Sequence, residues 1–149
     1  DNGTITGVQV STFDVSDRST PRQVDRLQLN DLLGLAKVNG EVTSPALDES
    51  RAFTYDPQRR LLLLPMTIYD WEPETSIAEQ PLVLPVTVRA HGTLAAADPF
   101  QLDRVNDDMV SRVLIDGDSF HAVAASSVVT GGLDGMQQTG RASLGTNAP

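Results

Sequence analysis

The chain has 149 residues, 40% of them hydrophobic and 21% charged, which is typical of one globular domain with a core of its own. Its formal net charge of −9, with Lys37 as the only lysine, argues against binding to nucleic-acid phosphates or to an anionic membrane, because both need clustered basic side chains. Cysteine is absent, which excludes disulfides and thiolate metal sites, and the longest apolar run, residues 61–66, is too short to span a bilayer.

The first part of the chain predicts a strand pair. Residues 7–15 (GVQVSTFDV) are rich in Val, Thr and Phe, and their apolar positions change parity between Val10 and Phe13, as in a bulge or in a strand covered on both faces. In the polar turn that follows, Asp17 is placed to accept hydrogen bonds from the backbone ahead of it. Residues 22–29 predict the second strand. Residues 30–50 then predict an irregular connector with one helical turn near its start.

The middle of the chain predicts a hairpin and two long apolar strands. Residues 51–55 and 60–64 flank the turn residues 56–59, where Pro57 presets a type I turn. The runs at 61–68 (LLLLPMTI) and 81–88 (PLVLPVTV) resemble each other, and we expect them to pair across an acidic loop at residues 69–76. Proline cannot donate a ladder hydrogen bond, so Pro65 and Pro85 are expected at a strand edge or bulge. Short strands are expected at 93–97 and 100–105.

The last part of the chain carries the strongest fold signal. Asp116-Gly117 and Asp134-Gly135 each lie between runs of apolar and β-branched residues, which is typical of a hairpin with a primed turn. A third reversal is expected near Ser126. Residues 110–144 therefore predict four antiparallel strands, in about the length of one β-propeller blade of roughly 40–45 residues.

Together these elements predict an all-β fold: a β-propeller segment of about two and a half four-stranded antiparallel blades within residues 1–145. The division is a half-blade at 7–29, a connector at 30–50, a blade at 51–105 and a blade at 110–144, followed by a disordered tail at 146–149. The alternative fold is a self-contained β-sandwich of about seven strands. The two readings differ in strand count and pairing.

We further predict that the chain is not a complete propeller, because a closed ring needs about 4–8 blades. The apolar runs at 61–64 and 82–88 lack polar alternation, as expected of strands covered on both faces. The chain opens on Asp1 with neither an initiator methionine nor a signal sequence, so we expect a piece of something longer. The remaining blades would come from an upstream part of the same gene product, from a separate chain or from another copy.

The order of these motifs resembles a known family. It is carried by GVQVSTFDVSD with Pro21, by RAFTYDP with the Leu-rich run that ends at Pro65, and by SRVLIDG at residues 111–117. This order resembles the C-terminal part of a family of secreted bacterial and archaeal proteins with a C-terminal β-propeller distantly related to WD repeats. The resemblance covers nearly the whole chain. It implies a location outside the cytoplasm, either secreted or in the cell envelope, and it implies no chemistry for any residue.

Each candidate site has a structural interpretation beside the functional one. His91 and His121 are the only histidines, and since no nucleophile motif accompanies them we expect ordinary strand or loop residues. Asp116 and Asp118 resemble the start of a calcium loop whose later ligands are missing. Asp14, Asp17 and the acidic residues at 103–108 would need to converge to bind a cation.

The best candidate for a partner contact is the loop that holds Tyr69 and Trp71, because a lone tryptophan among Glu and Pro has no evident core role. Packing of this loop over a blade edge is the interpretation that we favour, and contact with a partner is the other. We predict no catalytic residue, no cofactor and no dedicated metal site.

The predicted function is non-enzymatic: a segment that serves protein binding or scaffolding outside the cytoplasm. The alternative is part of a propeller hydrolase or lyase, with a site formed by loops at the central channel. Histidine or carboxylate side chains that converge there from different blades would favour the enzyme.

Overall fold

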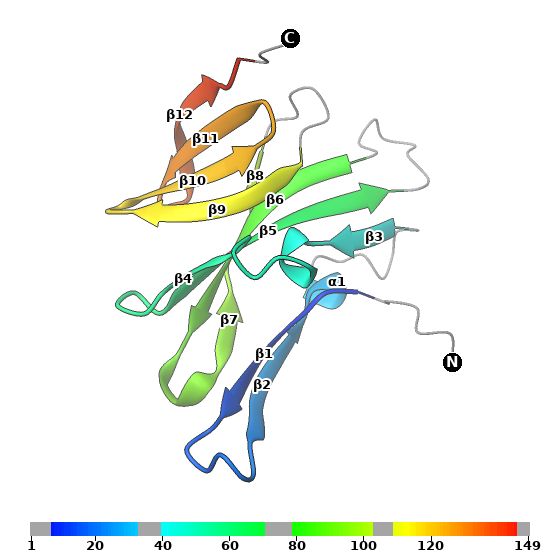
Figure 1. Ribbon diagram of the computed structural model, residues 1–149, viewed down its shortest axis with the longest axis vertical. Helices are drawn as coiled ribbons and strands as arrows, with labels where there is room; N and C mark the ends of the chain where they lie inside the picture. Colours follow the sequence, from blue (N-terminus) through cyan, green and yellow to red (C-terminus); the bar gives the residue numbers. More distant parts are fainter. Residues whose placement is uncertain (1–6, 33–39, 71–78, 103–108, 146–149) are drawn as a thin grey trace.

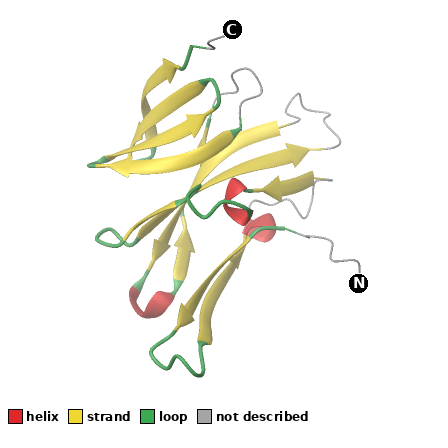
Figure 2. Cartoon of the chain, in the orientation of Figure 1, coloured by secondary structure: helices red, strands yellow, loops and turns green. Residues whose placement is uncertain are grey.

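The computed structural model describes residues 7–32, 40–70, 79–102 and 109–145, which are mostly strands joined by turns (Figure 2). The strands are β1 (Gln9–Asp14), β2 (Arg22–Gln28), β3 (Gly40–Thr43), β4 (Thr54–Asp56), β5 (Leu61–Asp70), β6 (Glu79–Val88), β7 (Leu94–Ala96), β8 (Phe100–Gln101), β9 (Val110–Asp116), β10 (Ser119–Ala124), β11 (Ser127–Gly132) and β12 (Gln137–Ser143). The helical segments of the described residues are α1 (Leu29–Leu32), η2 (Pro45–Leu47) and η3 (Ala90–Gly92). The predicted all-β class is confirmed.

The strands form three antiparallel sheets (Figure 1). β1 and β2 form a two-stranded sheet, and β9 to β12 form a four-stranded sheet in which each strand pairs with the next along the chain. In the central sheet, β5 pairs with β6, β3 and β4 share the outer edge of β5, and β7 and β8 share the outer edge of β6. The central sheet is therefore four strands wide.

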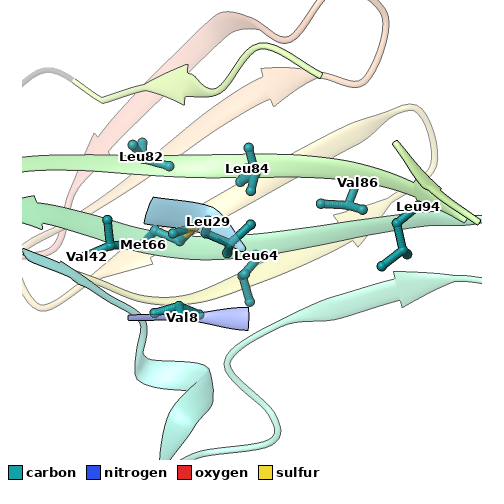
Figure 3. Packing of buried hydrophobic residues seen from close by; sticks show 9 residues of the cluster. All are labelled: Val8, Leu29, Val42, Leu64, Met66, Leu82, Leu84, Val86 and Leu94. Carbon is teal, nitrogen blue, oxygen red and sulfur yellow. The ribbon is translucent and has the colours of Figure 1, made fainter. Parts of the chain in front are cut away.

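β5 and β6 are buried on both faces and hold the layers together. One face of the central sheet packs against β1, β2 and α1 through a cluster in which Leu82, Leu84 and Val86 are fully buried (Figure 3). The other face packs against the four-stranded sheet, where Leu63 and Val83 meet residues of β9, β10 and β11. This arrangement confirms the prediction that the two apolar runs are covered on both sides, and it agrees with stacked propeller blades.

The prolines of these two strands lie where the outer partner changes. The carbonyl oxygen of Pro65 accepts a hydrogen bond from Ser44 Oγ (2.7 Å), and that of Pro85 accepts one from the N–H of Ala97 (2.9 Å). The nitrogen and the carbonyl of a strand residue point to the same edge, so each proline nitrogen also faces outward. On the outer edge of β5, β4 pairs with the residues before Pro65 and β3 with residues after it. On the outer edge of β6, β8 pairs with residues before Pro85 and β7 with the residues after it. The strands are thus internal, contrary to expectation, but no bond of the β5–β6 ladder is lost.

Both Asp-Gly hairpins are confirmed, with a correction in detail. Asp116 pairs with Ser119, so the first turn consists of Gly117 and Asp118, and the positive φ falls on Gly117 (56°). Glycine at the first turn position is typical of a type II′ turn. In the second turn, residues 133–136, the positive φ angles fall on Gly135 (73°) and Met136.

The prediction was right for the β1–β2 hairpin and partly wrong for the connector that follows it. The register of β1 shifts between Thr12 and Phe13, which favours the bulge over the other expectation, a strand covered on both faces. The turn after β1 is also as predicted, because Asp17 Oδ1 accepts from the N–H of Ser19 (2.9 Å). The irregular connector predicted at 30–50 is wrong at residues 40–43, since β3 pairs there with β5. The sequence did not predict β3, because a strand of four residues is too short to show a clear alternation of apolar and polar side chains.

Candidate functional site

Tyr69 lies near the end of β5, between two acidic neighbours. Glu41 of β3 and Glu79 of β6 are its direct cross-strand partners. The phenol donates a hydrogen bond to the sulfur of Met109 (2.9 Å), which precedes β9. Burial, and next the two glutamates, raise the pKa of Tyr69 above its usual 10.0, so the phenol is a neutral donor near pH 7. Trp71, the other predicted contact residue, lies outside the described residues.

Tyr69 borders a crevice of about 470 Å³ between the central sheet and the four-stranded sheet. Its other lining residues come from β3, η2, β5 and the two ends of the β9–β10 hairpin: Thr43, Ser44, Pro45, Asp48, Thr67, Met109, Val110, Ser111 and Ala125. Ser44 holds η2 in place at one side of this crevice. Its side chain is buried and, as the N-cap of η2, accepts a hydrogen bond from the N–H of Ala46. Hydroxyl groups and one carboxylate can bind a polar partner here, but among the described lining residues no base stands beside a nucleophile.

A second hollow of about 430 Å³ lies between β1 and the central sheet, at a place where the sequence predicted no site. We call this hollow the trough. It is lined by the side of β1, by η2 and by residues of β4 to β7: Val8, Gln9, Val10, Ser11, Thr12, Ala46, Leu47, Phe53, Tyr55, Leu62, Leu64, Val88 and Leu94. Phe53 and Tyr55 are both exposed there. The signal in the sequence was their spacing of two within the strand predicted at residues 51–55, since residues two apart in a strand share one face. In the structure β4 begins at Thr54, and Phe53 directly precedes it.

The two histidines lie in different parts of the fold. His91 is exposed in the β6–β7 turn with a φ of 60°, in η3, which contacts β1 and β2. His121 lies on β10 in the four-stranded sheet, with Nδ1 2.9 Å from Thr130 Oγ1 on the neighbouring strand. The structure therefore places each of them as a turn or strand residue, which is how we interpreted them from the sequence.

Among the acidic candidates for a cation, Asp17 and Asp118 instead bind neighbouring groups of the protein. Asp17 accepts hydrogen bonds from Ser19 and Thr20, which lower its pKa to about 2. Asp118 forms an ion pair with Arg59 (2.6 Å). Within the described ranges, no group of three or more His, Asp or Glu side chains lies close enough to hold a metal ion. The acidic residues at 103–108 lie outside those ranges.

Comparison with known proteins adds one match. The family model described as Beta propeller domain matches residues 1–136 of the chain. No curated protein and no solved structure matches the chain. The match favours the propeller segment over the β-sandwich that was kept as the alternative fold. Within the described residues, no helix has the length and apolar character needed to cross a membrane.

Proposed function

Since the chain belongs to the β-propeller domain family, we propose that it is a non-enzymatic propeller segment that serves protein binding or scaffolding. The observation that carries this proposal is the nature of its hollows. The trough is lined by apolar and neutral residues, and the crevice beside Tyr69 by apolar residues, hydroxyl groups and the single carboxylate of Asp48. The described lining of neither hollow includes a histidine, so both offer contact surface more than reactive groups. The separation of the two histidines between a turn and a different sheet also favours binding over the hydrolase or lyase alternative.

The proposal includes completion by other blades. A half-blade at 7–29, a blade at 51–105 and a blade at 110–144 fall short of the roughly 4–8 blades that close a ring. The remaining blades would belong to the same protein or to another chain. The unequal layers support this proposal, because β1 and β2 form a sheet only two strands wide beside sheets that are four strands wide.

We also propose that the protein works outside the cytoplasm, in the secreted fraction or the cell envelope. The support is the resemblance of its turn and strand motifs to secreted propellers, whose relation to WD repeats is likewise part of the proposal. Fractionation of the source cells, with an antibody raised against this chain, tests the location. Recovery of the protein from the cytoplasmic fraction alone would contradict it.

The proposal that the chain is a propeller segment is tested by measuring the association and the thermal unfolding of residues 1–149 without any partner. We expect association that increases with concentration and a broad thermal transition, because apolar surface that other blades would cover is left exposed. Mass in solution and a calorimetric melt measure both properties. A monodisperse monomer with one cooperative transition would overturn the proposal, whereas recovery of such a transition only with a partner segment would support it.

A further inference from the structure

Among the described residues β1 pairs with β2 alone, and the other edge of β1 borders the trough. The N–H of Leu29 donates to the carbonyl of Val8 (3.0 Å), so the backbone groups of Val8 point toward β2. Backbone groups alternate between the two edges of a strand, and therefore those of Gln9 and Ser11 point away from β2. All five residues 8–12 line the trough, which requires that the edge of β1, and not only one of its faces, borders it.

The β1–β2 layer covers only part of the central sheet. Thr12 Oγ1 donates to the carbonyl of Gly92 (2.6 Å), and Asp25 accepts from the N–H of Leu94 (2.8 Å), so the hairpin is held over η3 and β7. From Leu94 the trough extends across β6 and β5 to β4, and Tyr55 of β4 and Leu62 of β5 form the part of its floor that lies farthest from β7. A layer of four strands would cover this floor, and the two present strands leave it open.

We infer that the free edge of β1 and the trough bind two further β-strands, which complete this layer and come from a part of the same propeller outside residues 1–149. The strand next to β1 would pair with it in the antiparallel sense, like every strand pair of the described residues. Its inward side chains would be apolar and uncharged, because none of the described residues that line the trough carries a charge. This inference rests on the proposed function, since it assumes that blades are missing.

A symmetric second copy does not fit the same place. Neighbouring antiparallel strands are related by a two-fold axis perpendicular to their sheet, so β1 and a copy of β1 would be related in this way. A rotation about such an axis would place the central sheets of both copies on the same side of the layer formed by the two β1 strands. The central sheet of each copy would then occupy the space beneath the trough of the other, and the two sheets would clash. The occupant must therefore be strands that bring no central sheet of their own to that side.

The test is a tethered probe. A designed hairpin with strands of the length of β1, with valine at inward and threonine at outward positions, is joined ahead of residue 1 by a glycine–serine linker, which raises its effective concentration. Hydrogen exchange at micromolar concentration, read by mass spectrometry with residue resolution, reports the amides of Gln9 and Ser11. We expect both amides to exchange quickly in the unmodified chain and about tenfold or more slowly with the probe attached.

Two matched variants control this experiment. Tyr55→Lys places a charge in the trough and should abolish the protection of Gln9 and Ser11, whereas Leu114→Lys on β9, at nearly equal exposure (43% and 44%), should leave it intact. Leu47→Lys, also in the trough, replaces Tyr55→Lys if circular dichroism shows that Tyr55→Lys does not fold. Protection that both lysine variants lose equally would overturn the inference.

The inference would also be overturned if the probe did not slow the exchange of the Gln9 and Ser11 amides. It would likewise be overturned if these amides were already protected in the unmodified chain, whether at every concentration or only as the concentration rises. The last result would identify a second copy as the occupant. Failure of the proposed function is distinguishable, because it is read from the mass and melt of the unmodified chain, whereas this inference is read from the exchange of two amides.

Discussion

The four-stranded sheet and the β1–β2 hairpin are built from the same kind of unit but depend on their surroundings to different degrees. β9 to β12 pair in sequence order, and their inward row, which includes Phe120, Ala122 and Val129, is buried against the central sheet. In the β1–β2 region, Phe13 and Val24 remain exposed, and β2 is the one strand that pairs with β1 in the part of the chain that the structure describes. An isolated two-stranded hairpin is marginal in water, so β1–β2 must depend more on its docking than the four-stranded sheet does.

The largest effect should come from the centre of the four-stranded sheet. Phe120 is fully buried, and its ring meets that of Phe100 edge-on, with centroids 5.0 Å apart. Phe120→Ala should lower the free energy of unfolding by about 3–5 kcal/mol, because it leaves a cavity between two sheets. Phe13→Ala in β1, where the ring is exposed, should cost about 0.5 kcal/mol or less. Urea denaturation measures both, and equal losses would contradict the comparison.

Overpacking at the same place should have the next largest effect. A methyl group on Gly131 would lie 2.4 Å from the Phe120 ring and 3.0 Å from the carbonyl of Gln137. Gly131→Ala should therefore lower the free energy of unfolding by about 1–3 kcal/mol. Gly140→Ala in β12 is the control, since the added methyl would lie 3.9 Å from Thr130. A loss at position 140 as large as at 131 would show that the sheet tolerates no added methyl group at either position, so that the Phe120 ring is not the cause.

A smaller effect should follow when the docking of β1–β2 is weakened. The N–H groups of Leu94, and then Arg26, donate to the Asp25 carboxylate and hold its pKa below the usual 3.8. A carboxyl whose pKa is lowered on folding stabilises the fold above its unfolded pKa, and this stabilisation is lost as the pH falls through the folded pKa. Asp25→Ala should lower the melting temperature near pH 7 and leave it unchanged at a pH below both pKa values.

Asp25→Asn is the matched control, because the amide keeps an oxygen that can accept from Leu94 but does not titrate over this range. Its melting temperature should lie between those of the parent and Asp25→Ala near pH 7. Melting curves recorded across acidic pH test both variants. A parent and an Asp25→Ala chain that differ by the same amount at every pH would contradict a role for the ionised carboxylate.

The smallest effect is expected at the surface, where one ion-pair network joins the central sheet to the four-stranded sheet. Arg59 contacts Asp56 (2.7 Å) in its own turn and Asp118 (2.6 Å) in the β9–β10 turn. Asp118→Asn should lower the melting temperature slightly at low salt, and the difference should vanish near 1 M salt, where the Debye length is about 3 Å. A difference that persists at high salt would indicate a hydrogen bond rather than charge attraction.

Much of the fold was predictable because its signals are local. The hairpins at residues 117–118 and 133–136 follow from Asp-Gly between β-branched runs, and the bulge in β1 follows from the change of apolar parity. The pairing of β5 with β6 followed from two similar runs on either side of a loop. β3 and the short β8 carried no such signal, since strands of two to four residues show no periodicity.

The candidate site was predictable only in part. The sequence indicated Tyr69 because it lies close to Trp71 in the same loop. In the structure Tyr69 lines a crevice together with Met109, to which it donates a hydrogen bond and which lies forty positions further along the chain. The trough could not be predicted, because it is bordered by β1 and by β4, which no local pattern places side by side. Its only trace in the sequence was the pair Phe53 and Tyr55.

The sequence by itself determined the all-β class, the turns and the demand for cover on both faces of β5 and β6, because φ preferences and apolar patterning act over a few residues. Only the tertiary structure decided which layer covers each face, where Pro65 and Pro85 could be accommodated, and which edge of β1 stayed open. These depend on contacts between segments far apart in the chain, such as Asp25 with Leu94 and Thr54 with Val113, which local energies do not specify.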